Sequence, residues 1–383
     1  MSKRSLKNKL FVFIVGILFV SMASFGVFTL LTSFFSLSKD DGSSWDGVSV
    51  SSSFSSGNGS SDNPFIIKSG ADLAYFKEVI EGINSSTFNE LYYELGSNID
   101  LGDKEFQTIG KYVDGEEHIF KGNFDGNGYT IKNARIVGNS GKDVELYGLF
   151  GSVEGATISN FNLENVDIYT KSSGASLIIG NIASEVRSGS TIKNISVFDN
   201  TIDLTLSNDN GNKIGTLFGV VSNNVIVKNI AVDSNLSSKF VNGIAKVSHT
   251  INSSLDNIVV NVEVDSLLLE KIDNYVYSSN NSIISNLYEG SVIDNRLVLS
   301  TNTNSVVDSL NYGLVDEFVW EYNSNKIKLV RTVEDEVIVP MNFSFGQTVL
   351  TEHETGVVGD TAYLNDLSGD YNDFMGRNYT WED

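Results

Sequence analysis

The sequence predicts an all-β protein built as a right-handed parallel β-helix (a solenoid), with a short N-terminal capping helix and a small C-terminal β module. Two recurring features and one missing feature predict it. A phrase of apolar, polar, Asn, apolar, polar and apolar residues recurs, a Gly precedes the Asn at a near-constant distance, and no helix-length segment separates the repeats. The Asn stands at Asn133, Asn160, Asn194, Asn229, Asn257 and Asn286. The Gly stands at Gly148, Gly180, Gly215 and Gly243.

The spacing of the repeats selects the solenoid over other β folds. The six Asn are 27, 34, 35, 28 and 29 residues apart, and each Gly lies 12 or 14 residues before the next Asn. A βαβ crossover is excluded because the repeats leave no room for a helix. The main alternative is an antiparallel sandwich or a propeller, but a propeller blade needs about 40–45 residues. We expect each Asn at a corner between two strands, where it tolerates left-handed backbone and pairs with the Asn one coil away.

The N-terminal segment predicts export. Four basic residues between positions 3 and 9 precede an apolar run from Leu10 to Val20, and apolar residues resume from Phe25 to Leu37. A basic stretch, a short apolar core and small residues at a possible cut are typical of a secretory signal. The 28 residues from Leu10 to Leu37 are also long enough to span a bilayer. Residues 1–37 are therefore predicted to be a signal peptide or a membrane anchor, and both send the remainder outside.

Composition excludes several classes of protein and site. The chain has 26 basic and 48 acidic residues and a net charge of -22. Without the four basic residues of the N-terminal segment, the exported part carries -26, which argues against nucleic-acid binding. Cys is absent, so disulfides and thiolate metal sites are impossible. Contact with a membrane is expected only through the N-terminal segment, if it stays uncleaved.

The chain divides into four predicted parts. After the N-terminal segment, residues 38–63 are predicted to form a Ser/Gly-rich linker and lead-in, residues 64–334 the parallel β-helix, and residues 335–383 a small β module, either complete or incomplete. Ser69 begins a capping-box pattern and Gly82 stands at a helix end, so one short helix is expected over 69–82, covering the first coil. No later helix is expected. The aromatic residues of 310–329 are interpreted as the last coil and its lid.

Several of these phrases resemble a known family. The segment Gly148-Leu149-Phe150-Gly151, preceded by the Gly-rich entry from Phe120 to Ile131, is similar to the motif of GLUG repeats. Trp45-Asp46-Gly47 and Asn63-Pro64-Phe65 resemble the family's N-terminal lead. This resemblance implies bacterial, cell-surface or secreted β-helical proteins, some of which precede the catalytic domain of immunoglobulin-A-cleaving metallopeptidases. The tail, 335–383, resembles the β-grasp repeat of the internalin-B type.

Catalytic chemistry was sought in the histidines and the acidic residues. The three His (His118, His249 and His353) are far apart, and the zinc-peptidase phrase begun by His353-Glu354 has Val at position 357. Acidic residues follow the repeated strands at similar offsets and could line one face, as a polysaccharide lyase or glycosidase requires. They are Asp167, Asp199, Asp233 and Asp265. We interpret them as a solvated face and predict no catalytic, cofactor-binding or metal-binding residue, and no cofactor.

The sequence thus predicts an exported bacterial cell-surface or extracellular protein, a non-enzymatic β-helical module for binding, adhesion or structural display. Its partner is an unknown extracellular ligand, a glycan or a host or cell-surface protein. Two alternatives stay open. One is an extracellular polysaccharide-degrading lyase or glycosidase on a β-helix, and the other is an accessory region of a larger exported peptidase.

Overall fold

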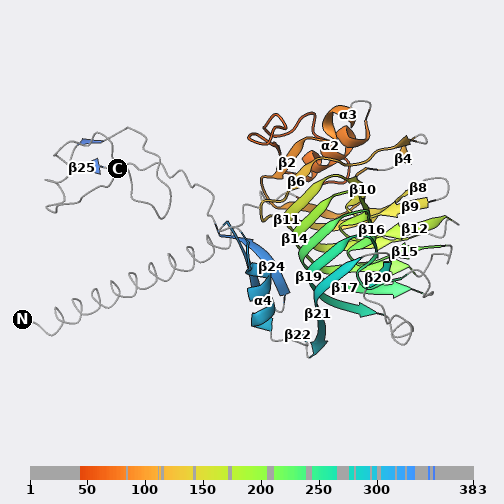
Figure 1. The fold of residues 1–383 in the computed structure, drawn as a ribbon. Helices are drawn as coiled ribbons and strands as arrows, with labels where there is room; N and C mark the ends of the chain where they lie inside the picture. The colour runs from red at the N-terminus through yellow and green to blue at the C-terminus, as the bar shows by residue number, and fades with distance from the viewer. Residues whose placement is uncertain are drawn as a thin grey trace, which may run out of the picture. The chain divides into compact units, whose positions relative to one another are not determined.

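The computed structural model describes most of the chain between residues 44 and 349. The described residues are 44–82, 85–110, 112–113, 116–140, 144–170, 175–204, 211–238, 244–264, 276–279, 282–293, 296–299, 303–314, 317–323, 326–332, 344–345 and 348–349. The chain divides into two compact units, one of Met1–Tyr312 with Trp320–Leu329 and one of Gly313–Val319 with Val330–Asp383. The first unit carries the solenoid (Figure 1).

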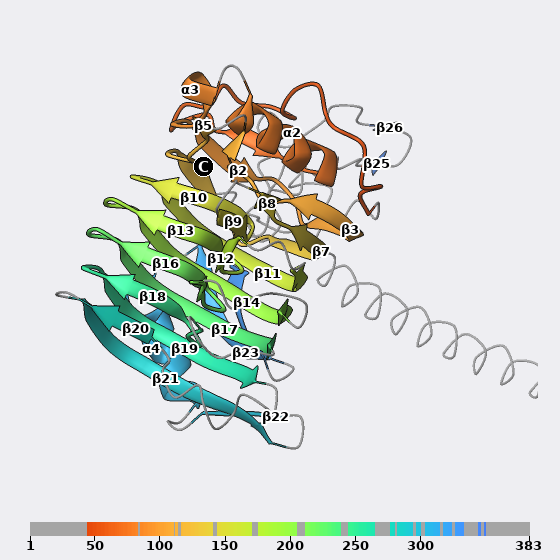
Figure 2. The same cartoon turned by 90° about the vertical axis from the view of Figure 1, so that its right-hand side faces the viewer.

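Most strands of the first unit belong to three sheets of stacked strands, as Figure 2 shows from the side. The long sheet contains β1 (Phe65–Ile67), β2 (Tyr92–Leu95), β3 (Ile99–Gln107), β6 (Asn123–Asp125), β7 (Thr130–Val137), β11 (Thr157–Tyr169), β14 (Thr191–Leu204), β17 (Ile226–Ser238), β19 (Ser254–Val264), β21 (Ile283–Ile293) and β22 (Arg296–Leu299). The second sheet contains β10 (Phe150–Glu154), β13 (Ala183–Arg187), β16 (Phe218–Ser222), β18 (Ser248–Ile251) and β20 (Val276–Ser279). The third contains β8 (Asn139–Ser140), β9 (Val144–Tyr147), β12 (Ser176–Ile179) and β15 (Lys213–Ile214).

The strands pair in parallel from one coil to the next, so the predicted right-handed parallel β-helix is confirmed. Ile158, Ile192, Val227 and Leu255 lie directly over one another on β11, β14, β17 and β19, and all four are fully buried. Such inward columns merge into one hydrophobic core. Burial of stacked aliphatic side chains is the main stabilising term for this fold, because each coil alone has no closed core.

The predicted helix covers the first coil. Helix α2 (Gly70–Glu81) begins after Ser69, whose side chain accepts a hydrogen bond from the Asp72 N–H at 3.1 Å. Its buried face includes Phe76, which packs against Tyr93 and Phe124 of the first coils. A second, four-residue helix, α3 (Ser85–Phe88), follows. The capping pattern thus marked the helix start correctly, and the helix shields the open edge that a solenoid leaves at its first coil.

The lead-in packs on this cap. Ser51 and Ser55 donate to the two carboxylate oxygens of Asp72 at 2.6 and 2.7 Å. Trp45 packs edge-on against Phe106 at 5.7 Å between ring centroids. Residues 44–63 are therefore tied to the first coils at several points, as the presence of Trp within a Ser/Gly-rich stretch suggested.

Acid is expected to release the start of this lead-in. Hydrogen bonds from the Ser49 hydroxyl and from the Ser49 and Val48 N–H groups lower the pKa of Asp46 to about 2. Because this value lies below the ordinary 3.8, the bonds stabilise the turn fully above pH 4 and are lost as the pH falls from about 4 through 2. Trp45 donates to the Ser49 carbonyl of the same turn, so its fluorescence should change over that window. Asp46→Asn, which cannot titrate, should lose this change; an unaltered acid titration of that variant would contradict the prediction.

The region after the last coil differs from the prediction. Residues 303–311 form a helix, α4 (Thr303–Asn311), that the sequence analysis did not predict. Strands β23 (Phe318–Asn323) and β24 (Lys326–Arg331) pair with each other and add no further coil to the stack. The interpretation of 310–329 as a last coil with its lid is therefore wrong. The aromatic residues correctly indicated a partly buried segment. Their spacing could not show that this segment runs back along the outer face of the solenoid toward β11 and β14.

The remaining elements are short. Strands β4 (Tyr112–Val113) and β5 (Glu116–Glu117) form a hairpin, and in the second unit β25 (Ser344–Phe345) pairs antiparallel with β26 (Thr348–Val349). Residues 1–37 and all other residues of the predicted module 335–383 lie outside the described residues. Among the described helices, none is long and apolar enough to cross a membrane.

Candidate functional site

Four of the predicted corner asparagines form one hydrogen-bonded ladder along the solenoid. Each side-chain Nδ2 donates to the Oδ1 one coil earlier: Asn194 to Asn160 at 2.9 Å, Asn229 to Asn194 at 3.1 Å, and Asn257 to Asn229 at 2.7 Å. All four have φ between 55° and 61° and are buried. Asn suits this corner because it tolerates left-handed backbone and its amide satisfies both neighbours.

Different groups end the ladder on its two sides. At the first end, Asn160 Nδ2 donates to both oxygens of Asp125, at 3.0 and 3.1 Å, and a carboxylate can only accept there. At the other end, the Ser309 hydroxyl of α4 donates to Asn257 Oδ1 at 3.1 Å. Asn286 lies in register with Asn257, but its Nδ2 donates to Asp256 Oδ1 at 2.8 Å. Ser309 of the unpredicted helix thus makes the hydrogen bond to Asn257 that was expected from Asn286.

Asn133 does not belong to this ladder. The register of β7 on β11 places Asn133 opposite Asn165, whose Nδ2 donates to Asn133 Oδ1 at 2.8 Å. Asn133 in turn donates to Asp100 at 3.0 Å. The expectation that all six Asn share one column is corrected here, and Ile131 correspondingly lies over Leu163, not Ile158. The physical reason is that β11 bends at two positions of left-handed backbone, Asn160 and Asn165, and the sequence around both has the same pattern.

Asp100 is the charged group that accepts a hydrogen bond from Asn133 at the corner shared with Asn165. Partial burial opposes its ionisation, but hydrogen bonds from Asn133 and the Gly102 N–H, with Lys132 at 3.5 Å, keep the pKa of Asp100 below its ordinary value. The carboxylate is therefore ionised and fully engaged in holding the corner.

The predicted glycines mark a third column, where the third sheet turns into the second. Gly148, Gly180 and Gly215 directly follow the last residues of β9, β12 and β15. The Gly180 N–H donates to the Tyr147 carbonyl and the Gly215 N–H to the Ile179 carbonyl, both at 3.0 Å, so the glycines occupy equivalent positions in successive coils. A Cβ at Gly148 would lie 2.4 Å from the Gly180 carbonyl oxygen. Ala245 takes the equivalent position in the next coil, because its N–H bonds the Ile214 carbonyl at 2.8 Å. Gly243 lies outside the described residues.

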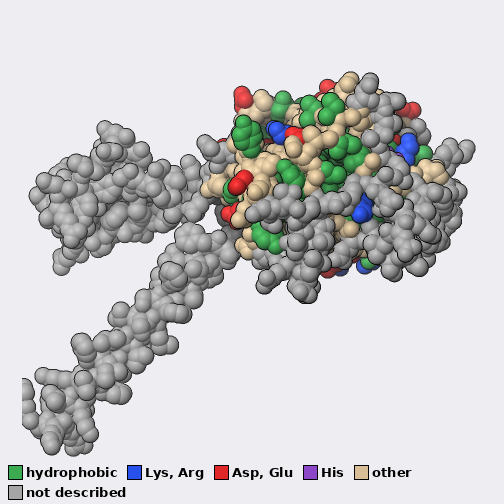
Figure 3. All heavy atoms as spheres, turned by 60° about the horizontal axis from the view of Figure 1, so that its bottom comes forward, with side chains coloured by type: hydrophobic (Ala, Val, Ile, Leu, Met, Phe, Trp, Pro, Cys, Tyr) green, Lys and Arg blue, Asp and Glu red, His purple; other side chains and the backbone are tan. Residues whose placement is uncertain are grey.

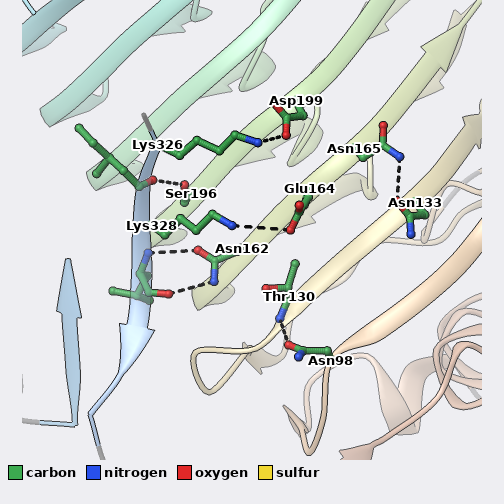
Figure 4. A network of polar contacts seen from close by, with 12 residues as sticks. Asn98, Thr130, Asn133, Asn162, Glu164, Asn165, Ser196, Asp199, Lys326 and Lys328 are labelled. Atoms are coloured by element: carbon green, nitrogen blue, oxygen red, sulfur yellow. Dashed lines mark hydrogen bonds and ion pairs between the residues drawn. The ribbon is translucent and has the colours of Figure 1, made fainter. Parts of the chain in front are cut away.

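The outer face of the long sheet carries a strip that is covered by the chain itself. This covered strip lies on β11, β14, β17 and β19, just after the ladder asparagine of each strand. It consists of six buried residues: Asn162, Ser196, Phe198, Ala231, Val259 and Asn261. The strap consists of α4 and residues 320–329. Figure 4 shows how the β24 part of the strap lies against β11 and β14. The Asn162 side chain bonds both backbone groups of Leu329, at 3.0 and 3.1 Å, and the Ser196 hydroxyl donates to the Ile327 carbonyl at 2.6 Å.

Two lysines of the strap enclose an aromatic ring of the strip. Lys326 Nζ lies 5.0 Å and Lys328 Nζ 4.2 Å from the centroid of the Phe198 ring. Lys326 also pairs with Asp199, and Lys328 lies 3.9 Å from Glu164. The cations thus contact an aromatic ring of the strip and two acidic residues beside it, which gives the strap a specific register on the sheet.

Next to the covered strip, the outward positions before the ladder corner form open rows. The open rows consist of Thr157, Thr191, Ile226, Ser254 and Ile283 in one register, and Ser159, Lys193, Lys228, Asp256 and Ser285 in the next. Ile226 is 51% and Ile283 65% exposed. On the molecular face drawn in Figure 3, hydrophobic side chains form separate groups among uncharged polar side chains. Except for Ser159, which is buried, the residues of the open rows are half-buried or exposed, and they lie outside the covered strip.

The acidic residues considered as a catalytic face do not form one row. Asp167 pairs in register with Thr201, and Asp233 with Phe198, while Asp199 contacts Lys326. Burial raises the pKa of Asp167, against hydrogen bonding by Thr201 and the nearby charge of Arg135. Asp265 and His353 lie outside the described residues, His118 follows β5, and His249 lies on β18. Within the described part of the chain, no group of three or more His, Asp or Glu could hold a metal ion.

An ionic cluster that the sequence analysis did not single out lies on the second sheet. Arg187 of β13 pairs with Glu185 and, at 2.9 Å, with Glu117 of the β4–β5 hairpin. Ser152 donates to Glu117 at 2.8 Å. Burial opposes the charge of Arg187, but its two acidic partners hold its pKa above the ordinary value. The cluster joins residues 70 positions apart, which no local pattern could have shown.

Loss of Arg187 is expected to free the hairpin. Arg187→Met leaves the carboxylates of Glu117 and Glu185 facing each other, so we expect a loss of about 2 kcal/mol of unfolding free energy, less than for a fully buried pair because these side chains are 15–26% exposed. Amide exchange at Glu116 and Glu117 should accelerate. Lys121→Gln, which breaks a 3.9 Å surface pair with Glu154, is the control and should cost at most about 0.5 kcal/mol. Equal exchange in the two variants would refute a pinning role for Arg187.

Comparison with known proteins yields two similarities. No protein family matches the chain. Over 180 residues the chain is 32% identical to halomucin from Haloquadratum walsbyi, a stretch that covers 45% of this chain and 2% of halomucin. A crystal structure from Bacteroides ovatus, described as a candidate immunoglobulin A1 protease, aligns with a TM-score of 0.36 and 13% identity over 73% of this chain and 95% of that one. At that score the likeness carries no argument. The chain is thus a β-solenoid whose sequence is similar in part to a much longer protein.

Proposed function

We propose that the protein is an exported surface or extracellular protein whose solenoid is a non-enzymatic module for binding or structural display. The observation that carries the proposal is the division of the outer face of the long sheet. One strip is covered by the strap, whereas the open rows present polar and apolar side chains in register from coil to coil. A regular, open, flat surface suits an extended partner better than a small substrate, which needs a concave site.

Two further observations support the proposal. The N-terminal basic and apolar segment favours export. The partial similarity to halomucin fits a surface-associated β-solenoid. Membership of the GLUG-motif proteins, which the Gly148–Gly151 segment suggests, is part of the same proposal.

One experiment that measures both binding and turnover distinguishes a binding module from a polysaccharide-degrading enzyme. The purified protein is applied to a glycan array and, in parallel, incubated with soluble uronate and neutral polysaccharides while reducing ends and unsaturated products are measured. We expect binding without turnover, and reduced binding for a variant with Ile226→Ser, Lys228→Ala and Ile283→Ser. A matched variant, Asn235→Ala, changes an exposed residue of β17 outside the open rows and should bind normally. Turnover of any polymer would overturn the non-enzymatic assignment.

Export is tested separately. A tag placed after the last residue should be accessible to antibody or protease on intact cells or be recovered from the medium. Retention of all tagged protein inside the cell would contradict the proposal, whatever the binding assay shows.

A further inference from the structure

The strap makes a connection across the solenoid that bypasses a large part of the chain. Asn162 on β11 and Leu329 at the end of the strap are 167 residues apart in sequence, yet they are joined by two hydrogen bonds of 3.0 and 3.1 Å. Between them lie the whole of β14, β17, β19 and β21 and the strap itself. Any chain that continues after Leu329 therefore leaves the solenoid beside β11, not beside the last coil.

The contacts of the strap are spread along this path. Near the last coils, Ser309 of α4 bonds Asn257, and the Tyr288 hydroxyl donates to Ser309 Oγ at 3.2 Å. The helix is joined to the strand pair by Asn311, whose side chain bonds both backbone groups of Trp320, at 2.6 and 3.0 Å. Trp320 is almost fully buried. The strap is thus attached to the solenoid at both ends, and its two parts are joined to each other in the middle.

The terminal coils are the weakest part of a solenoid under load. Each coil contacts only its neighbours, so a pull on a chain that leaves the last coil would detach the coils one after another. A pull on the chain after Leu329 acts first on the contacts of the strap with β11 and β14. As long as these hold, residues 163–328 carry no tension, because the load passes directly from Leu329 to Asn162.

We propose that the strap is a mechanical clasp, which transfers tension applied after Leu329 to the middle of the stack and so protects the later coils from being peeled off. The inference rests on the proposed function in one respect, since a surface module that binds a partner bears load through its chain. The clasp itself is a property of the folded protein and does not depend on where the protein is located.

Single-molecule force spectroscopy on the full chain tests the clasp. The chain has no Cys, so Thr157→Cys at the start of β11 and one Cys added after the last residue attach the two handles specifically. With this placement the coils before β11 lie outside the loaded path. We expect no release of single coils before the clasp ruptures. Single coils correspond to steps of 28 to 35 residues, or about 100 to 120 Å. Rupture should then make up to 167 residues, about 570 Å, available to the load.

Variants of the strap separate the clasp from general stability. Lys326→Gln with Lys328→Gln removes the two cations but no buried apolar group, so the fold should persist, and Asn162→Ala with Ser196→Ala removes the backbone contacts. Both should show coil-sized steps at a lower force than the parent protein. Thr191→Ala is the matched control, because Thr191 lies on β14 but outside the covered strip, and this variant should behave like the parent protein. Coil-sized steps in the parent at the same force as in both variants would overturn the clasp. A protein that passes this test but fails to reach the cell surface would refute only the proposed function.

Discussion

Replacing Asn194 by alanine is expected to lower the free energy of unfolding by about 4 kcal/mol. The change removes both ladder bonds and leaves Asn160 Oδ1 and Asn229 Nδ2 without their partner in a buried place, which costs about 1–3 kcal/mol for each group. It also puts alanine at a φ of 56°, which costs about 1–2 kcal/mol. Urea denaturation of the two proteins measures the difference, and partial relaxation keeps the total below the simple sum.

Two matched variants separate these contributions. Asn194→Gly loses the same bonds but has no penalty for left-handed backbone, so it should be about 1 kcal/mol less destabilising than the alanine variant. Asn286→Ala changes a corner with a similar φ of 49° that is exposed and outside the ladder, and it should cost only about 1–2 kcal/mol. If Asn194→Ala and Asn286→Ala were equally stable, the ladder would contribute nothing beyond backbone conformation.

Replacing Gly180 by alanine is expected to cost about 3 kcal/mol for a purely steric reason. The added Cβ would lie 2.4 Å from Phe218 Cα and 2.6 Å from the carbonyl oxygens of Ala183 and Leu217. All three atoms are backbone of the same or the next coil, so no side-chain rotation can relieve the clash, and the coils have to separate. Thermal or urea unfolding, followed by circular dichroism, measures the loss.

Gly189 provides the control for this steric effect. It has a φ of 76° and no atom within 4 Å of an added Cβ, so Gly189→Ala adds backbone strain without a clash and should cost about 1 kcal/mol. Ala245 occupies the position of Gly180 two coils later, so glycine is not needed at this position in every coil. A loss at Gly180 no larger than at Gly189 would contradict close coil contact as the reason for glycine.

The ambiguity of Asn133 shows where a repeat pattern stops being informative. Leu163-Glu164-Asn165-Val166-Asp167-Ile168 has the same form as the phrase around Asn160, five residues earlier on the same strand. Both places need a residue that accepts left-handed backbone, with inward apolar neighbours on both sides, so the same residue types are selected twice on β11. Only the strand register reveals that Asn133 lies over Asn165.

The strands and corners of each coil were predictable from the sequence because each depends on the residues of one short segment. Alternating apolar residues, an Asn that accepts a φ near 60° and a Gly without room for a Cβ can each be recognised within a segment of a few residues. Because the coils stack on one another, the same residue types recur from coil to coil. The covered strip, the Arg187 cluster and the clasp were decided by the tertiary structure alone. Their longest-range contacts join residues 70, 131 and 167 positions apart, and the amide, hydroxyl and ionic groups that make them are common on any polar surface. The local sequence therefore does not distinguish them.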